Sequence, residues 1–157
     1  MVEWKPCPSH MQGGDFDLWA VNTKLTFSTF TFSAENAWIN DLVERNSKVL
    51  KVTLNSATAG KKRSREGDLV AIEAPNGAKV TATLRVSEGV HPEVISIPGV
   101  FGRWLTSNPR LRGQGAHFNS LLGYSFDRMD TVSAALDSCV KVKVSRASQN
   151  GKAEMRD

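Results

Sequence analysis

The chain has 157 residues, of which 40% are hydrophobic and 23% are charged, a composition typical of one globular domain that buries a core of its own. A formal net charge of +4 favours anionic partners without identifying one. The two cysteines, Cys7 and Cys139, lie at opposite ends of the chain and predict neither a disulfide framework nor a zinc site. The sequence has no apolar run near the roughly 20 residues that span a membrane and no charged leader with an apolar core, so we expect neither membrane insertion nor a signal peptide.

The N-terminal third begins without a regular pattern and then turns into predicted structure. Residues 1–16 contain two prolines and a Gly-Gly pair but no periodic face, and they predict a connector from a preceding domain. Residues 17–22 are rich in types that suit a pleated, half-buried surface, which predicts a strand. In residues 33–47, apolar side chains recur at helical spacing after a serine, which predicts a short helix or a pair of turns.

A strongly cationic run follows. Residues 48–55 predict a second strand, and residues 56–64 predict a short helix with Ser56 as its N-cap. Around the end of that helix, four cations occupy five positions, namely Lys61, Lys62, Arg63 and Arg65. A phosphate-binding patch, a targeting signal and the solvated end of a helix are three interpretations of this run.

Apolar alternation dominates the middle of the chain. Residues 69–72 predict a strand, and the Pro-Asn-Gly sequence at 75–77 predicts a tight hairpin turn, because Asn-Gly tolerates positive φ angles. An apolar side chain then recurs at every second position, at Val80, Ala82, Leu84 and Val86. Residues 90–100 predict another strand, with prolines confined to its ends.

The C-terminal half holds a long irregular segment. Residues 101–125 contain four glycines and no sustained period, and a loop of this length inside a compact domain usually serves a function or an interface. Residues 139–147 alternate cleanly and predict the last strand, and residues 148–157 predict a frayed tail. Five or six strands with very little helix predict a mainly β fold, either a barrel or a sandwich.

Candidates for catalysis are few. The three histidines, His10, His91 and His117, fall in no nucleophile or metal motif, and we interpret them as surface or turn residues. The C-terminal quarter contains three aspartates, Asp127, Asp130 and Asp137. The residues around them are typical of a turn and of the start of a strand, so we do not interpret them as paired catalytic carboxylates. Cys139 opens an alternating strand and is interpreted as a small buried hydrophobic residue. These residues predict a binding domain.

Two stretches carry hydroxyls, amides and aromatic rings directly after strand-like segments. They are "NTKLTFSTF" at residues 22–30 and "GQGAHFNS" at residues 113–120. Side chains of these types suit a phosphate or a heteroaromatic ring. The alternative is that both stretches are ordinary barrel loops.

The order of features along the chain resembles a known family. The segments that carry the resemblance are "LWAVNTKL", "AENAWINDL", "TLNSATAGKKRSREGDLVAIEAPNG", "VSEGVHPEVISIPGVFGRW", "GAHFNSLL" and "SAALDSCVKVKV". Together they resemble the C-terminal molybdopterin-dinucleotide-binding domain of the dimethyl sulfoxide reductase family, in particular its polysulfide, thiosulfate and tetrathionate reductase branch. The resemblance extends over residues 17–144, and it lies in the order and spacing of the segments rather than in any single one.

The resemblance implies a six-stranded double-psi β-barrel over residues 17–147, with short helices and a long loop in the C-terminal half. It implies molybdopterin guanine dinucleotide as the cofactor, in a molybdenum or tungsten oxidoreductase whose metal ligand lies in another domain. The implied partners are the preceding cofactor-bearing domains of the same parent enzyme, with electron-transfer subunits as further candidates. The chain alone would be an excised C-terminal part without activity, and it would take no nucleic acid.

The resemblance also implies which residues contact the cofactor. These residues come from four segments: the one after the first strand, the helical turn, the loop after the "HPEV" strand and the late loop. They are Asn22, Thr23, Lys24, Ser28, Thr29, Asn36, Gly102, Arg103, Trp104 and Asn119. The chemistry agrees, because a lysine offsets pyrophosphate charge and an asparagine presents both a donor and an acceptor to a ring edge.

The chain departs from the family pattern at two places. Arg63 stands where many relatives have glycine, so the turn before Gly67 and Asp68 is expected to differ, and a common turn near the last strand has the sequence "DTVSAA" here. In the family, residues 61–65 form the helix end and turn that lead into the Gly-Asp strand. We therefore interpret the cationic run as a solvated helix end, with Asp68 bonding the adjacent backbone.

Two other classes of protein were weighed. A small basic β-barrel that binds nucleic acid is the alternative function, with Phe27, Phe30, Phe32 and Trp38 available for stacking. The basic residues cluster away from these aromatics, which argues against it. A self-processing enzyme on the same type of barrel would need a Gly-Ser dipeptide, and the sequence contains none.

Overall fold

The structure is a computed structural model that describes residue 11 and residues 13–28, 31–126, 129–130, 132, 134–135 and 138–147, with the backbone alone at 31 and 32. The predicted tail at 148–157 and most of the predicted connector at 1–16 lie outside the described residues. The domain boundaries therefore stay a prediction. None of the helices in the described part of the chain is long and apolar enough to cross a membrane.

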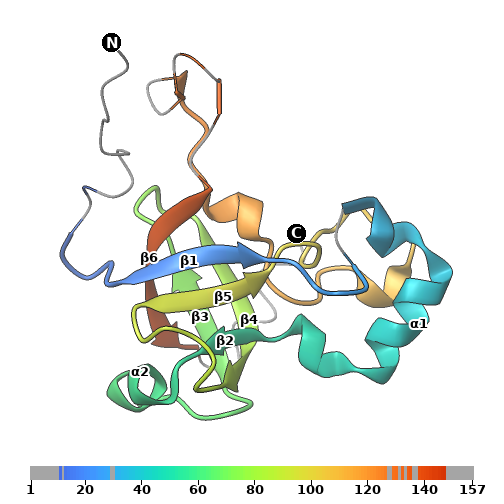
Figure 1. Ribbon diagram of the computed structural model, residues 1–157, viewed down its shortest axis with the longest axis horizontal. Coiled ribbons are helices and arrows are strands. Elements are labelled where there is room, and N and C mark those ends of the chain that lie inside the picture. Colours follow the sequence, from blue (N-terminus) through green and yellow to red (C-terminus); the bar gives the residue numbers. More distant parts are fainter. Residues whose placement is uncertain are drawn as a thin grey trace.

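Six strands close into a barrel with the order β1-β5-β2-β4-β3-β6 (Figure 1). Their bounds are Leu18–Thr23 for β1, Val52–Leu54 for β2, Leu69–Glu73 for β3, Lys79–Val86 for β4, Val94–Pro98 for β5 and Cys139–Arg146 for β6. The α-helices among the described residues are short, α1 at Ala37–Arg45 and α2 at Ser56–Lys61. The predicted mainly β fold with a six-stranded barrel is confirmed.

Two strand pairs are parallel, β1 with β5 and β2 with β4, and the other four pairs are antiparallel. Parallel neighbours need crossover connections, because a hairpin cannot join them. As a result β1, β3 and β5 all finish at one end of the barrel, where β2, β4 and β6 begin. We call this the β1/β5 end, and Thr23 and Pro98 are paired there.

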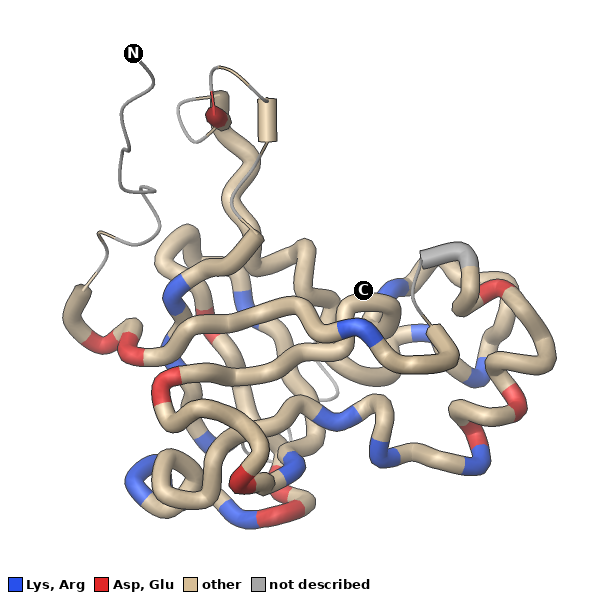
Figure 2. Tube along the Cα trace, viewed as in Figure 1, with Lys and Arg blue, Asp and Glu red and all other residues tan. Residues whose placement is uncertain are grey.

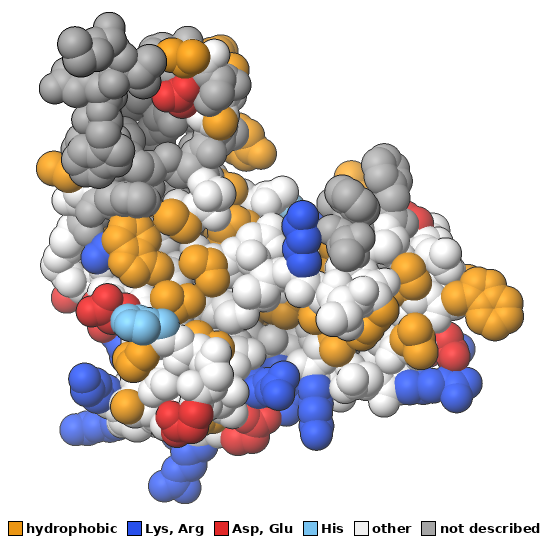
Figure 3. Space-filling model, in the orientation of Figure 1, with side chains coloured by type: hydrophobic (Ala, Val, Ile, Leu, Met, Phe, Trp, Pro, Cys, Tyr) orange, Lys and Arg blue, Asp and Glu red, His pale blue; other side chains and the backbone are white. Residues whose placement is uncertain are grey.

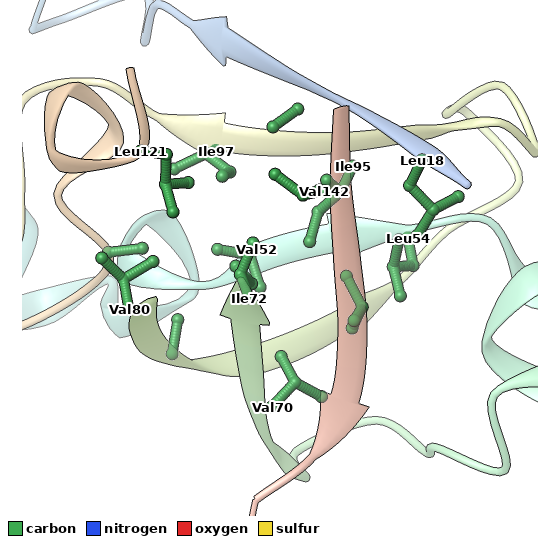
Figure 4. Packing of buried hydrophobic residues seen from close by; sticks show 14 of the residues in the cluster. Leu18, Val52, Leu54, Val70, Ile72, Val80, Ile95, Ile97, Leu121 and Val142 are labelled. Carbon is green, nitrogen blue, oxygen red and sulfur yellow. The ribbon is translucent and has the colours of Figure 1, made fainter. Parts of the chain in front are cut away.

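The barrel interior is apolar because each strand turns every second side chain inward. Val80, Ala82 and Leu84 of β4 are buried, as their alternation predicts. At the β1/β5 end, Leu121 lies beside Val80 and Ile97 (Figure 4). The 3-10 helix Phe118–Leu121 thus closes the core at this end with residues from the long loop.

A second, smaller core lies beside the β1/β5 end (Figure 1). It joins α1, the 3-10 helix Ser47–Leu50 and the segment after β5, and its buried members are Val43, Val100, Phe101 and Leu111. Leu25 and Phe27, from the turn after β1, pack against it. We call this unit the α1 lobe. It fixes the path of the chain where both β1 and β5 end.

The helix caps differ from the expected ones. The predicted N-cap at Ser56 is wrong, because Asn55 caps α2 by accepting a 2.9 Å hydrogen bond from the backbone of Ala57. Ser56 instead donates to Glu88. Asn36 likewise caps α1. An asparagine accepts from the second backbone N–H of a helix as readily as a serine does, so sequence alone left the boundary one residue uncertain.

Two predicted strands are shorter in the structure. The segment 48–55 forms a strand only at Val52–Leu54, because Ser47–Leu50 turns as a 3-10 helix. The segment 90–100 forms a strand only from Val94, where the backbone N–H donates to His91 in a turn.

The cationic run lies at the opposite end of the barrel from the β1/β5 end (Figure 2). Lys61, Arg63 and Arg65 are exposed, as expected of a solvated helix end, whereas Lys62 makes a 2.6 Å ion pair with Asp17 before β1. Gly67 has a φ of 86°, and Asp68 accepts a 2.9 Å hydrogen bond from the backbone of Arg65. The expected turn and its Asp68 bond are both confirmed.

Arg63 itself has a φ of 52°, in the left-handed region that glycine occupies without a steric cost. We expect Arg63→Gly to stabilise the fold by about 0.5–1 kcal/mol, because relief of that strain exceeds the extra chain entropy of glycine. Urea unfolding of both chains measures it. The matched control is Arg65→Gly, where φ is not positive and glycine should destabilise. Equal losses of stability in the two variants would contradict the prediction.

Candidate functional site

The end of β1 is locked onto the end of β5. Asn22 pairs with Ile97 and Thr23 with Pro98 in the parallel register. The hydroxyls of Thr23 and Ser96 lie 2.9 Å apart, and the backbone N–H of Gly99 donates to Thr23 at 3.2 Å. The predicted site residues Asn22 and Thr23 therefore stand at the β1/β5 end, directly beside the start of the loop that follows β5.

The chain after β1 turns back at once. Lys24 is exposed, and the backbone of Ser28 donates to Leu25 at 3.3 Å to close a tight turn. The side chain of Ser28 is buried, with its hydroxyl 2.8 Å from that of Ser33, so it holds the turn together rather than facing solvent. The predicted residue Thr29 lies outside the described residues.

The loop after β5 packs on the late loop through glycine. Gly102 has a φ of 81°, and its backbone N–H donates to Gln114 at 2.7 Å. A Cβ atom at this position would lie 2.2 Å from the backbone nitrogen of His117. The backbone of Gly113 also donates to Arg103, at 2.9 Å. Two segments that are distant in sequence thus lie backbone against backbone.

A cavity of about 450 Å³ opens between these two segments and the start of β4. Its walls are Lys79, Val80, Thr81, Gly102, Arg103, Trp104, Leu105, Gly113, Gly115, His117 and Ser120. Trp104 is half exposed, and a Cβ atom added at Gly113 would lie 3.2 Å from its indole ring, closer than ordinary van der Waals contact. No acidic side chain lines this cavity within the described part of the chain. Cations, hydroxyls and an indole face suit a flat ring that carries an anionic group.

Arg103 is held in place by an ion pair. Its guanidinium lies 3.2 Å from the carboxylate of Glu35, which also accepts a 2.6 Å hydrogen bond from the backbone of Ser107. The pKa of Glu35 is lowered chiefly by hydrogen bonds from Ser107, and secondarily by the charge of Arg103. Glu35 therefore stays ionised at neutral pH and fixes the arginine between the α1 lobe and the cavity.

His117 stands on the opposite wall of the cavity. Its Nδ1 atom lies 2.7 Å from the hydroxyl of Ser120. Burial, and then the positive charge of Arg103, lower the pKa of His117 below its usual 6.5. A neutral imidazole at pH 7 can donate or accept a hydrogen bond towards the cavity. Asn119 is exposed, two residues further along the same 3-10 helix.

Comparison with known families gives a decisive match. The model of the Molydopterin dinucleotide binding domain family matches residues 27–139. The chain belongs to this family. The matched range contains the α1 lobe, the residues that line the cavity, the four strands β2 to β5 and the first residue of β6. The expected membership is therefore confirmed, and the alternative of a nucleic-acid-binding barrel is not favoured.

A solved structure shares the fold of this Molydopterin dinucleotide binding domain. Acetylene Hydratase from Pelobacter acetylenicus matches with a TM-score of 0.64 and 13% sequence identity, over 85% of the present chain. The chain spans 19% of the length of that protein. Comparison with curated proteins gives no match. At this identity the likeness describes the fold alone.

Two predicted residues of the domain have different surroundings from the others. Asn36 lies in the α1 lobe, and its side-chain oxygen accepts a 2.9 Å hydrogen bond from Trp38 as the cap of α1. Ser28 is buried in its turn. Asn22, Thr23, Lys24 and residues 102–104, by contrast, all follow or end the two parallel strands at the β1/β5 end.

Two polar residues of the cavity, Lys79 and Thr81, were not predicted from the sequence. They lie on the outward face of an alternating strand, and only the tertiary structure brings a loop across that face. His117 and Ser120 belong to the candidate stretch 113–120, although the interpretation of His117 itself was a surface or turn residue. Among the described residues, no group of three His, Cys, Asp or Glu side chains could hold a metal ion.

The lowered pKa of His117 has a measurable consequence. Following its ring protons by NMR against pH should give a midpoint below 6.5, because burial and Arg103 disfavour the charged form. The unfolded chain then binds the proton of His117 more tightly than the folded chain does. Protonation of His117 therefore lowers the stability of the fold as pH falls through 6.5. Arg103→Gln should raise the midpoint only in part, since burial is the larger cause. A wild-type midpoint at or above 6.5 would contradict this.

Proposed function

We propose that this domain binds molybdopterin guanine dinucleotide at its β1/β5 end, as one part of a molybdenum or tungsten oxidoreductase. The observation that carries the proposal is the cavity between the loop after β5, the late loop and the start of β4, which has cationic, hydroxyl and indole walls and lies at the barrel end where the segment after β1 also begins. Membership in the Molydopterin dinucleotide binding domain family supports it. Family membership does not specify the guanine part of the cofactor, the metal or the parent enzyme, and we propose these in addition.

The side chains of this end have the chemistry that the cofactor requires. Lys24 is exposed beside the β1 end, and Arg103 lies in the cavity wall, so both can offset phosphate charge. Trp104 offers a ring face, and Asn22 and Asn119 each offer a donor and an acceptor to a ring edge. When bound, the cofactor supplies the metal and its redox chemistry. The chain's own residues bind and orient it, with the metal ligand supplied from another domain.

Exposed apolar side chains mark the contacts with that larger protein. Trp38 on the α1 lobe is 84% exposed, Leu105 beside the cavity 89% and Phe126, after the late loop, 93%. Figure 3 shows a large apolar side chain standing out from the α1 lobe at the right of the view. Apolar side chains scattered singly are common on protein surfaces, so family membership rather than exposure alone supports a covering protein part here. We assign these surfaces to the preceding cofactor-bearing domains, with electron-transfer subunits as further partners.

The binding function is tested by NMR titration of the isotope-labelled chain with guanosine diphosphate. We expect amide signals to shift in residues 22–28, 102–104 and 117–120, and signals of residues 61–65 to stay still. Binding should be weak, because the isolated domain supplies only part of the cofactor's enclosure. Shifts centred on residues 61–65 would overturn the proposal in favour of plain phosphate attraction. A stronger response to single-stranded nucleic acid that falls steeply with salt would also overturn it.

The place in a larger enzyme is tested in source cells with an antibody against this chain. We expect a band far larger than a 157-residue polypeptide on a denaturing gel, or a large complex on a native gel if the parts are separate subunits. The purified chain alone should carry neither redox activity nor stoichiometric molybdenum or tungsten. A free 157-residue chain under native conditions, or one tightly held metal ion per chain, would contradict this assignment.

A further inference from the structure

Asn22 has an unusual neighbour. A Cβ atom built on Gly99 would lie 1.9 Å from the side-chain oxygen of Asn22 and 2.4 Å from both its Cγ and its Nδ2 atoms. The carboxamide of Asn22 therefore lies directly over the α-carbon of Gly99, in the space that any other residue type would fill. Asn22 is otherwise exposed at the end of β1.

The strand register explains why these two residues meet. Asn22 pairs with Ile97 across the parallel β1 and β5 strands, two positions before Gly99. The backbone bond from Gly99 to Thr23 then draws the loop start under the end of β1. The contact is thus built from the barrel itself rather than from a mobile surface loop.

Gly99 differs from the other crowded glycine of this end. At Gly102 an added Cβ would strike backbone atoms, and its φ of 81° disfavours any side chain. At Gly99 φ lies outside the left-handed region, and the three atoms nearest to the added Cβ all belong to the movable end of the Asn22 side chain. Alanine at position 99 should therefore leave the barrel intact and displace the carboxamide of Asn22.

We propose that Gly99 is a positioning residue that holds the Asn22 carboxamide at the β1/β5 end, where Asn22 determines ring specificity. A carboxamide pressed against the backbone presents its acceptor and its donor in one fixed order. A lactam edge, a carbonyl next to a ring N–H, and the aminopyrimidine edge of adenine present donor and acceptor in opposite orders. A carboxamide fixed in one orientation therefore pairs with only one of them when the phosphate end of the ligand is also held, and we assign the lactam edge to this site. The proposal rests on the proposed function, since the ring belongs to the ligand bound at this end.

The experiment uses the full chain and four variants: Gly99→Ala, Asn22→Ala, the double variant and Gly60→Ala. Gly60 is the matched control, because it is an exposed glycine of α2 with nothing within 4 Å of an added Cβ. Guanosine diphosphate and adenosine diphosphate are titrated by NMR, and melting temperatures are recorded. We expect Gly99→Ala to keep the melting temperature within a few degrees. It should reduce the preference for guanosine diphosphate about 3- to 10-fold, as much as Asn22→Ala, which is the worth of one or two neutral hydrogen bonds.

The double variant should lose no more than either single one, because both changes remove the same contact. A second readout needs no ligand: the side-chain NH₂ signals of Asn22 should move in free Gly99→Ala and stay still in Gly60→Ala. Unmoved signals overturn the positioning role. Normal nucleotide preference in Gly99→Ala, or additive losses in the double variant, overturn the specificity role while the proposed function stands. A wild-type chain that binds neither nucleotide overturns both the specificity role and the proposed function, even if the Asn22 signals move.

Discussion

Replacing Phe118 by alanine should destabilise the domain by about 3–5 kcal/mol, the cost of deleting a fully buried aromatic side chain. Phe118 is only 2% exposed and belongs to the main core, although it comes from the long loop rather than from a strand. Urea or thermal unfolding of the purified variant measures the loss. Removal of this ring should also loosen the late-loop wall of the cavity, because the same 3-10 helix carries Ser120.

The neighbouring residue provides the control. Asn119 is exposed on the same turn, so Asn119→Ala should keep the wild-type stability and weaken cofactor binding instead. A Phe118→Ala variant that unfolds at the wild-type urea concentration would contradict the view that the late loop closes the barrel.

The second large effect is expected at Gly102. Gly102→Ala should cost about 2–4 kcal/mol, because alanine adds left-handed strain to a clash with the backbone of His117. Relief of that clash would separate the loop after β5 from the late loop, so binding should fall together with stability. The same unfolding measurement and the nucleotide titration record both effects.

A variant at Gly77 measures the cost of the left-handed conformation without the backbone clash. It has a φ of 83° in the turn between β3 and β4, but nothing lies within 4 Å of an added Cβ. Gly77→Ala should therefore carry only the conformational cost, about 1 kcal/mol. Equal losses in the two variants would mean that the close approach of Gly102 to His117 contributes nothing.

Local patterns predicted the strands well wherever one face of the strand is buried. Strand pairing does not change the two-residue period seen at Val80, Ala82 and Leu84 and in the last strand, Cys139–Arg146. The turn at Gly77 likewise follows from its local sequence. Boundaries were less certain, as at Asn55, because neighbouring polar residues compete for one cap position. The residues left a barrel or a sandwich open, and the family resemblance favoured the barrel.

The candidate site was predictable only in part. Residues 102–104 were expected from the resemblance, but the cavity they line depends on Lys79 and His117, which tertiary structure brings together from other segments. The contact between Asn22 and Gly99 depends on the parallel register of β1 and β5, and no local pattern encodes that register. Sequence motifs identify the types of residue, whereas the tertiary structure determines which residues are in contact.

We propose above all that the β1/β5 end of this domain binds the molybdopterin dinucleotide cofactor. The most direct measurement is equilibrium dialysis of the intact chain against isolated molybdopterin guanine dinucleotide under anaerobic conditions, with the pterin detected by fluorescence. We predict saturable binding that guanosine diphosphate competes with and that Asn119→Ala and Lys24→Gln each weaken, while Lys61→Gln at the opposite end leaves it unchanged. The absence of saturable binding, or a loss caused by Lys61→Gln and not by the β1/β5-end variants, would contradict the account.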